Sequence, residues 1–117
     1  MALEITAKDL SGVTLLVLDG RVTLGKESNQ LRTTIKEILG KGKTRLVLDL
    51  AEVSYIDSAG LGTLVAGYTT ARNLGTTMKL ANLTKKFHEQ LNITKLVTVF
   101  EVYDSVEEAV KSFAPPA

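Results

Sequence analysis

The chain has 117 residues, of which 44% are hydrophobic, so its length and composition suit one compact domain and exclude a disordered chain. Its 14 basic and 13 acidic residues are mixed along the sequence and give a formal net charge of +1, which leaves no electrostatic footprint for binding DNA or RNA. The absence of cysteine excludes disulfides and thiolate metal sites, and the N-terminal residues lack the continuous apolar run of a signal peptide.

The first predicted elements are a pair of strands and a helix. Residues 3–10 and 12–20 form two strand-like runs, and the short Ser-Gly turn between them predicts a hairpin. A helix is predicted from about Gly25 to Leu39, because its apolar residues recur three and four positions apart and Gly40 is placed to end it.

From there strands and helices alternate. Strands are predicted at 44–50, 76–82 and 96–101, and helices at 60–74, 83–91 and 105–113. The last helix has the clearest local signal, because Ser105 and Glu108 form a capping box. The alternation predicts right-handed crossovers and a largely parallel sheet. No apolar run approaches the length of a membrane span, so we expect a single cytoplasmic domain, residues 1–117 with a core at about 3–113, that does not contact membranes.

The strand at 44–50 alternates apolar and polar residues. Leu46, Leu48 and Leu50 point to one side, and Val47 and Asp49 to the other. Parallel strands that are covered on both faces are usually continuous apolar runs. We therefore expect the helices mainly on one face of the sheet and the other face partly open, which argues against a doubly wound Rossmann sheet.

Residues 55–62, YIDSAGLG, place two glycines where a helix begins, although glycine there costs up to about 1 kcal/mol relative to alanine. A dinucleotide site would use Gly60 and Gly62 as the start of a glycine-rich fingerprint. That fingerprint needs its glycines directly after the strand and a third small residue at fixed spacing. Here about nine residues separate Leu50 from Gly60, and Val65 takes the third position. A nucleotide site is therefore disfavoured.

A hydrolase would need Ser58 as its nucleophile and His88 as its base. The Gly-x-Ser-x-Gly motif is absent, and His88 is the only histidine. His88 lies off the predicted apolar face of its helix, which is typical of a solvated surface histidine. One histidine and scattered carboxylates also provide no metal-ligand cluster. We expect no catalytic residue, no metal and no cofactor.

Two non-catalytic roles remain open for this stretch. Either Asp57 or Ser58 can cap the helix, which is worth about 1 kcal/mol. A cap does not explain both Gly60 and Gly62. Glycines on the outer surface of a first turn leave backbone exposed, which suits close docking by another protein.

The stretch LVLDLAEVSYIDSAGLGTLV, residues 46–65, resembles the signature of the STAS domain family, in particular bacterial anti-sigma-factor antagonists. LDGRV at 18–22 and VFEVYDSVEEAV at 99–110 resemble the segments before the family's first helix and at its close, so the resemblance covers nearly the whole chain. It implies an α/β fold: a single STAS domain with a mixed, mostly parallel five-stranded sheet and about four helices mainly on one face.

The resemblance also implies a function. Family members of this type bind an anti-sigma factor that is itself a serine kinase, and this binding frees the sigma factor. The kinase phosphorylates the serine after the motif aspartate, and a dedicated serine phosphatase reverses the reaction. By position that serine is Ser58. The expected partner-binding residues are Asp57, Ser58, Ala59, Gly60, Leu61, Gly62, Arg21 and Thr23.

Two residues depart from the family pattern. Ala59 stands where many antagonists carry a second serine or threonine, and Thr23 stands where the family often has an aspartate. Thr23 lies near the partner-binding surface in this family, so it bears on partner identity and on recognition by the kinase. An adaptor subunit of a stressosome or of a lipid-transport assembly is the alternative function, and a small nucleotide-binding protein is a third.

Overall fold

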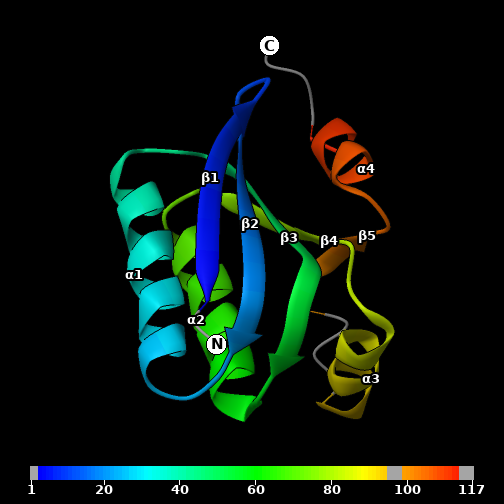
Figure 1. Ribbon diagram of the computed structural model, residues 1–117. Helices are drawn as coiled ribbons and strands as arrows, with labels where there is room; N and C mark the ends of the chain where they lie inside the picture. Colours follow the sequence, from blue (N-terminus) through cyan, green and yellow to red (C-terminus); the bar gives the residue numbers. More distant parts are fainter. Residues whose placement is uncertain (1–2, 95–98, 114–117) are drawn as a thin grey trace.

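The fold is one five-stranded sheet packed with four helices, seen in a computed structural model that describes residues 3–94 and 99–113 (Figure 1). The strands lie across the sheet in chain order: β1 (Glu4–Leu10), β2 (Val13–Val22), β3 (Arg45–Ile56), β4 (Thr77–Ala81) and β5 (Glu101–Tyr103). The helices are α1 (Lys26–Gly40), α2 (Ser58–Asn73), α3 (Lys85–Thr94) and α4 (Val106–Lys111). β1 pairs antiparallel with β2 and the other pairs are parallel, which confirms the predicted mixed, mostly parallel sheet.

The opening hairpin follows from its two turn residues. Ser11 and Gly12 both have positive φ, 54° and 84°, as a two-residue turn matched to the twist of the strands requires. The turn places Leu10 opposite Val13 and carries the register through to Glu4 opposite Asp19. The predicted hairpin is therefore confirmed.

The alternating strands separate two apolar clusters, one on each face of the sheet. The larger cluster joins α1, α2 and α3 to one face, and its strand residues include Leu16, Leu18, Leu46, Leu48, Leu50, Met78 and Leu80. Each fully buried leucine contributes about 1.5–3 kcal/mol to folding. The smaller cluster lies between the other face and α4, and its buried members are Val13, Leu15, Val47, Ala81 and Ala109. Most helices thus cover one face, as predicted, while α4 covers one end of the second, open face.

β3 is longer than the sequence indicated. It continues six residues past the predicted end at Leu50, to Ile56. The pairing with β2 shifts register twice, between Val17 and Asp19 and between Gly20 and Arg21. Such bulges break the strict alternation by which a strand is recognised in a sequence. Since β3 ends at Ile56, the glycines of α2 come soon after a strand, and the large spacing used to disfavour a nucleotide site was wrong.

The last strand is also displaced from its predicted position. The prediction was 96–101, whereas β5 is Glu101–Tyr103 and Val99 and Phe100 form a turn and a bend before it. Residues 96–98 lie outside the described part of the chain. α4 begins as predicted, because the Ser105 hydroxyl accepts the N–H of Glu108 at 3.0 Å. None of the helices in the described ranges combines the length and apolarity that a membrane span requires.

Candidate functional site

The start of α2 is built around Asp57, which follows β3 directly. Asp57 has extended backbone angles, φ −101° and ψ −178°, and its Oδ1 accepts the N–H of Gly60 at 2.8 Å. Its carbonyl accepts the N–H of Leu61 at 2.9 Å. Asp57 is therefore the N-cap, and Ser58 is the first residue of the helix. This geometry resolves which of the two residues caps α2.

Asp57 also ties α2 to the loop between β2 and α1. Its second carboxylate oxygen, Oδ2, accepts the N–H of Leu24 at 2.9 Å, and its own N–H donates to the carbonyl of Val22 at 3.2 Å. The N–H groups of Gly60 and Leu24 stabilise the charged carboxylate, so they lower the pKa of Asp57 below its ordinary value of 3.8. One ionised side chain thus joins three segments at the carboxyl end of the sheet.

Ser58 is exposed at the positive end of the helix dipole. Within the described residues its hydroxyl has no hydrogen-bond partner, and α2 has no acidic residue in its first turn. The position is therefore accessible and electrostatically favourable for a negative group.

The two glycines of α2 have different surroundings. Gly60 is buried, and a Cβ there would overlap the carbonyl oxygen of Val22 and lie 2.8 Å from Val22 Cγ1 and 2.9 Å from Ile56 Cγ1. Gly62 is exposed, and a Cβ there would meet no atom within 4 Å. The expectation that both glycines lie on the outer surface is therefore wrong for Gly60, which is required by the contact between α2 and the ends of β2 and β3.

The other expected partner-binding residues divide between surface and interior. Leu61 is buried in the core, and Ala59 is half-buried. Thr23 is half-buried and donates its hydroxyl to Glu27 Oε1 at 3.2 Å. Arg21 is exposed, with its guanidinium carbon 5.4 Å from the centre of the Tyr55 ring.

Two apolar side chains at this end of the molecule were not expected from the sequence. Leu24 is 77% exposed and Tyr55 is 39% exposed. No signal separates Leu24 from a core leucine in the sequence, because its exposure follows from the loop conformation. Tyr55 falls in the part of β3 that lies beyond the predicted strand. We call the exposed residues at this end the Ser58 surface: Arg21, Leu24, Tyr55, Ser58 and Gly62.

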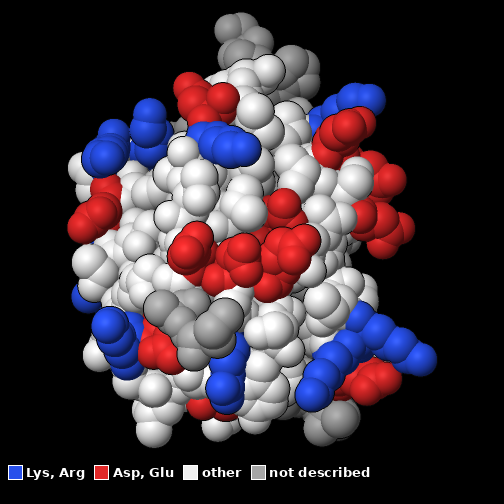
Figure 2. Space-filling model, viewed as in Figure 1, with Lys and Arg blue, Asp and Glu red and all other residues white. Residues whose placement is uncertain are grey.

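Charges are distributed unevenly over the open face of the sheet. Figure 2 shows acidic side chains gathered over the middle of this face, where the strand register places Glu4, Asp19 and Glu52 in one row. Basic side chains stand at the lower right, over α3. The ammonium of Lys86 in α3 lies 5.4 Å from the centre of the Tyr55 ring, and the guanidinium carbon of Arg21 lies at the same distance from it. The Ser58 surface is therefore basic where it meets the open face.

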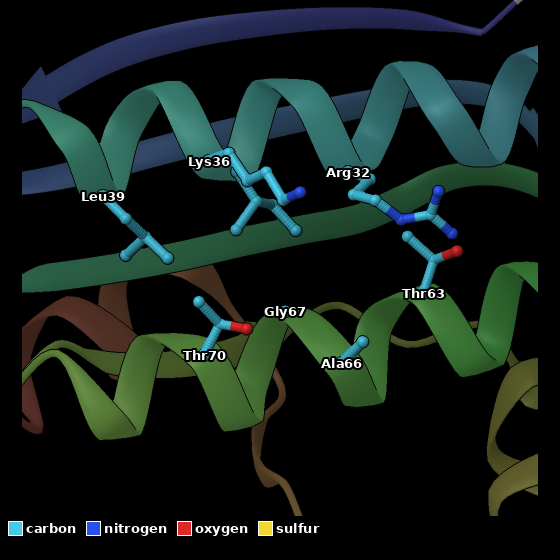
Figure 3. A pocket seen from close by; sticks show the side chains of 8 residues that line it. Arg32, Lys36, Leu39, Thr63, Ala66, Gly67 and Thr70 are labelled. Atoms are coloured by element: carbon cyan, nitrogen blue, oxygen red, sulfur yellow. The ribbon is translucent and has the colours of Figure 1, made fainter.

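A separate groove of about 250 Å³ lies between α1 and α2 (Figure 3). Its floor is apolar, and Arg32 and Lys36 of α1 stand opposite Thr63 and Thr70 of α2. Among the described residues, its lining contains no histidine or carboxylate, and the Thr63 hydroxyl donates to the carbonyl of Ala59 at 3.0 Å. The groove therefore offers no pair of groups for acid–base or nucleophilic chemistry.

The expectation of no catalytic residue and no metal site concerns His88 and the carboxylates. His88 is half-buried on α3, and its backbone N–H donates to the carbonyl of Thr84 at 3.0 Å. Over the described ranges, no three or more histidine, aspartate and glutamate side chains are grouped so that they could hold a metal ion.

The sequence matches a known family and is similar to a named bacterial protein. The model of a family described as the STAS domain matches residues 4–109. A protein of Bordetella bronchiseptica with the provisional name anti-sigma factor antagonist BtrV is 28% identical over 111 residues, covering 95% of this chain and 95% of that protein.

Solved structures share the fold. A crystal structure from Thermotoga maritima, provisionally described as an anti-sigma factor antagonist, superposes with a TM-score of 0.84 at 24% identity and covers 92% of each chain. The Bacillus cell fate determinant SpoIIAA in its phosphorylated form superposes with a TM-score of 0.71 at 17% identity, covering 94% of this chain and 97% of that one. At these identities the likeness concerns the fold.

Proposed function

Because the chain belongs to the STAS domain family, we propose that it is an anti-sigma-factor antagonist: it binds an anti-sigma factor with serine kinase activity and thereby releases the sigma factor. Phosphorylation of Ser58 by that kinase ends the binding, and a serine phosphatase restores it. The observation that carries this proposal is the exposed Ser58 at the first position of α2, directly after the capping Asp57. The relative in Bordetella that shares 28% of its residues supports the general function.

The proposed switch works through charge rather than through a change of shape. A phosphate on Ser58 adds about −1.5 to −2 charges. The positive end of α2 stabilises this charge, so the fold is retained. A partner that covers Ser58 must remove water from a dianion beside the Asp57 carboxylate, which costs several kcal/mol. Since each 1.4 kcal/mol is a factor of ten in affinity, one phosphate is enough to end binding.

The solved structure of SpoIIAA in a phosphorylated form supports the idea that this fold can carry a phosphate. The absence of acid–base or nucleophilic pairs in the groove between α1 and α2 supports a protein that binds but does not catalyse. The proposal places the protein in the cytoplasm, where its partners are an anti-sigma factor and a phosphatase, and gives it no direct contact with nucleic acid.

The test uses the purified chain and each anti-sigma-factor kinase encoded in the same genome. With ATP, the cognate kinase should add one phosphate, located at Ser58 by mass spectrometry, and calorimetric titration should show that the phosphorylated chain binds at least tenfold more weakly than the unmodified chain. If no kinase modifies Ser58 and none binds the chain, the antagonist function is wrong and the adaptor function is favoured.

A further inference from the structure

We infer that Leu24 is the side chain of the Ser58 surface that inserts into the partner, and that the partner presents an apolar pocket bordered by carboxylates. The inference rests on the proposed function and adds to it the chemistry of the partner's contact surface. It is carried by the exposure of Leu24, by the way its loop is held, and by the charges around Tyr55.

Leu24 is the most exposed of the large hydrophobic side chains in the described part of the chain. Its 77% exposure exceeds that of Leu74 at 63%, Tyr55 at 39% and Leu10 at 37%. Such a side chain gains little hydrophobic stabilisation from folding, and most of its apolar surface remains to be buried when a partner covers it. Leu24 lies beside Asp57, the capping residue of α2, so a partner that buries Leu24 also contacts the surroundings of Ser58.

The loop that carries Leu24 is held on both sides. The N–H of Leu24 donates to Asp57 Oδ2 at 2.9 Å. The carbonyl of the preceding Thr23 accepts both the N–H and the hydroxyl of Ser28, at 3.1 and 2.6 Å. The exposed leucine is therefore presented on a fixed backbone, so little conformational entropy is lost when a partner binds it.

The polar part of the surface indicates the partner's charge. Two cations lie over the Tyr55 ring, Arg21 from β2 and Lys86 from α3, each 5.4 Å from the ring centre. Asp57, the nearest carboxylate to Ser58 in sequence, already accepts hydrogen bonds from two backbone N–H groups. Partner carboxylates would be attracted by Arg21 and Lys86 and repelled by a phosphate on Ser58, so one partner chemistry accounts for both binding and its loss.

Tyrosine and arginine are among the residues that dominate binding energy at protein interfaces. An apolar side chain at the centre with an aromatic and cations beside it is the usual arrangement of such an interface, with polar residues toward the rim. The Ser58 surface has this composition, whereas the groove between α1 and α2 is lined by aliphatic side chains, threonines and two cations, with no aromatic residue among the described residues that line it.

The first test compares two exposed leucines. Leu24→Ser and Leu74→Ser each replace an exposed leucine by serine, but Leu74 lies past the far end of α2. Calorimetric titration with the cognate anti-sigma-factor kinase should give at least tenfold weaker binding for Leu24→Ser and a change of less than twofold for Leu74→Ser, with both melting temperatures near that of the unaltered chain. Equal affinities for the two variants would overturn the inference.

The second test examines charge. The double variant Arg21→Gln, Lys86→Gln should associate more slowly with the kinase and show a weaker dependence of the association rate on salt. The control Lys41→Gln, Lys43→Gln removes two exposed cations after α1 and should associate as the unaltered chain does. Faster association of the first variant would mean that the partner surface is basic, and would overturn the inference.

Different results would contradict the proposed function and the inferred contact surface. If the unaltered chain binds no anti-sigma factor, the proposed function fails. If it binds, and either Leu24→Ser or the charge variant binds as the unaltered chain does, the function stands and only the inferred contact surface is wrong.

Discussion

Gly60 of α2 packs its Cα so closely against the carbonyl of Val22 that no side chain fits between them. The contact joins the first turn of α2 to the end of β2, and the Asp57 carboxylate links the same two segments by accepting the N–H of Leu24. The start of α2 is therefore fixed by the fold before any partner binds.

The two glycines of α2 should respond oppositely to alanine. Gly60→Ala should lower the free energy of unfolding by about 1–3 kcal/mol, because the added methyl meets backbone at Val22 and cannot be accommodated without displacing a strand. Gly62→Ala should raise it by up to about 1 kcal/mol, because the site is open and alanine favours the helix. Urea denaturation of both variants measures the difference. Equal stabilities would mean that the contact with Val22 is not the reason for Gly60.

Substitutions at Ser58 should separate charge from shape. Ser58→Ala should change the unfolding free energy by no more than about 0.5 kcal/mol, because Asp57 provides the cap. Ser58→Glu should also fold, since an acidic residue suits a helix N-terminus. Calorimetry should nonetheless show at least tenfold weaker binding of the cognate kinase by Ser58→Glu than by Ser58→Ala.

High salt should restore only part of that loss, since charge at a dried surface is screened less than exposed charge. Gly62→Gln is the matched control for shape, because it adds bulk without charge at the docking surface while leaving Ser58 intact. If the alanine and glutamate variants bind equally, Ser58 is not a charge-sensitive contact.

Asp57 should make stability depend on pH in the acid range. Its pKa is lowered in the folded state, so its contribution to stability is fully present above the ordinary value of 3.8 and is lost as pH falls through the folded-state pKa. Asp57→Asn keeps a capping side chain but cannot titrate. Urea unfolding from roughly pH 6 to pH 2 should therefore show the two proteins converging in stability at the acid end. A constant difference across that range would exclude a role for the carboxylate charge.

Lys79 of β4 should stabilise the packing of α4 against the sheet. It is 5% exposed, and its ammonium donates to Ser112 Oγ at 2.7 Å, lies 3.6 Å from Glu101 Oε1 and sits 4.3 Å from the centre of the Phe113 ring. Lys79→Ala should lower the unfolding free energy by about 2 kcal/mol or more, because it leaves a cavity. Lys79→Met keeps most of the volume and should cost less.

Hydrogen exchange of the α4 amides provides the second measurement for these variants. Exchange should accelerate in Lys79→Ala well beyond any change in α1, because α4 is attached mainly through the smaller cluster. Uniform acceleration over the whole chain would mean that Lys79 supports the sheet rather than the attachment of α4.

The sequence predicted what depends on periodicity. The alternation of Leu46, Leu48 and Leu50 predicted a sheet with one well-covered face, and the capping box predicted the start of α4. The length of β3 could not be predicted, because bulges at two places shift its pairing and hide the strand from a two-residue pattern.

The residues of the site were predicted unequally. Ser58 and Asp57 stand in a recognisable motif, so their place at the start of a helix was predictable. The interior role of Gly60 and the exposure of Leu24 depend on how β2 and its loop meet α2, which is a contact between segments far apart in the sequence. The burial of Lys79 under α4 likewise depends on a distant segment.

The close contact between Gly60 and Val22 also affects how related copies of such a protein can diverge. Position 60 is fixed by the chain's own backbone, whereas positions 24 and 62 face solvent and impose no demand on the fold. A duplicated gene could therefore acquire a different partner by exchanging side chains at 24 and 62 alone. Several such proteins could then operate in one cell without cross-reaction, because discrimination needs only a poor fit with the wrong partner at those two positions.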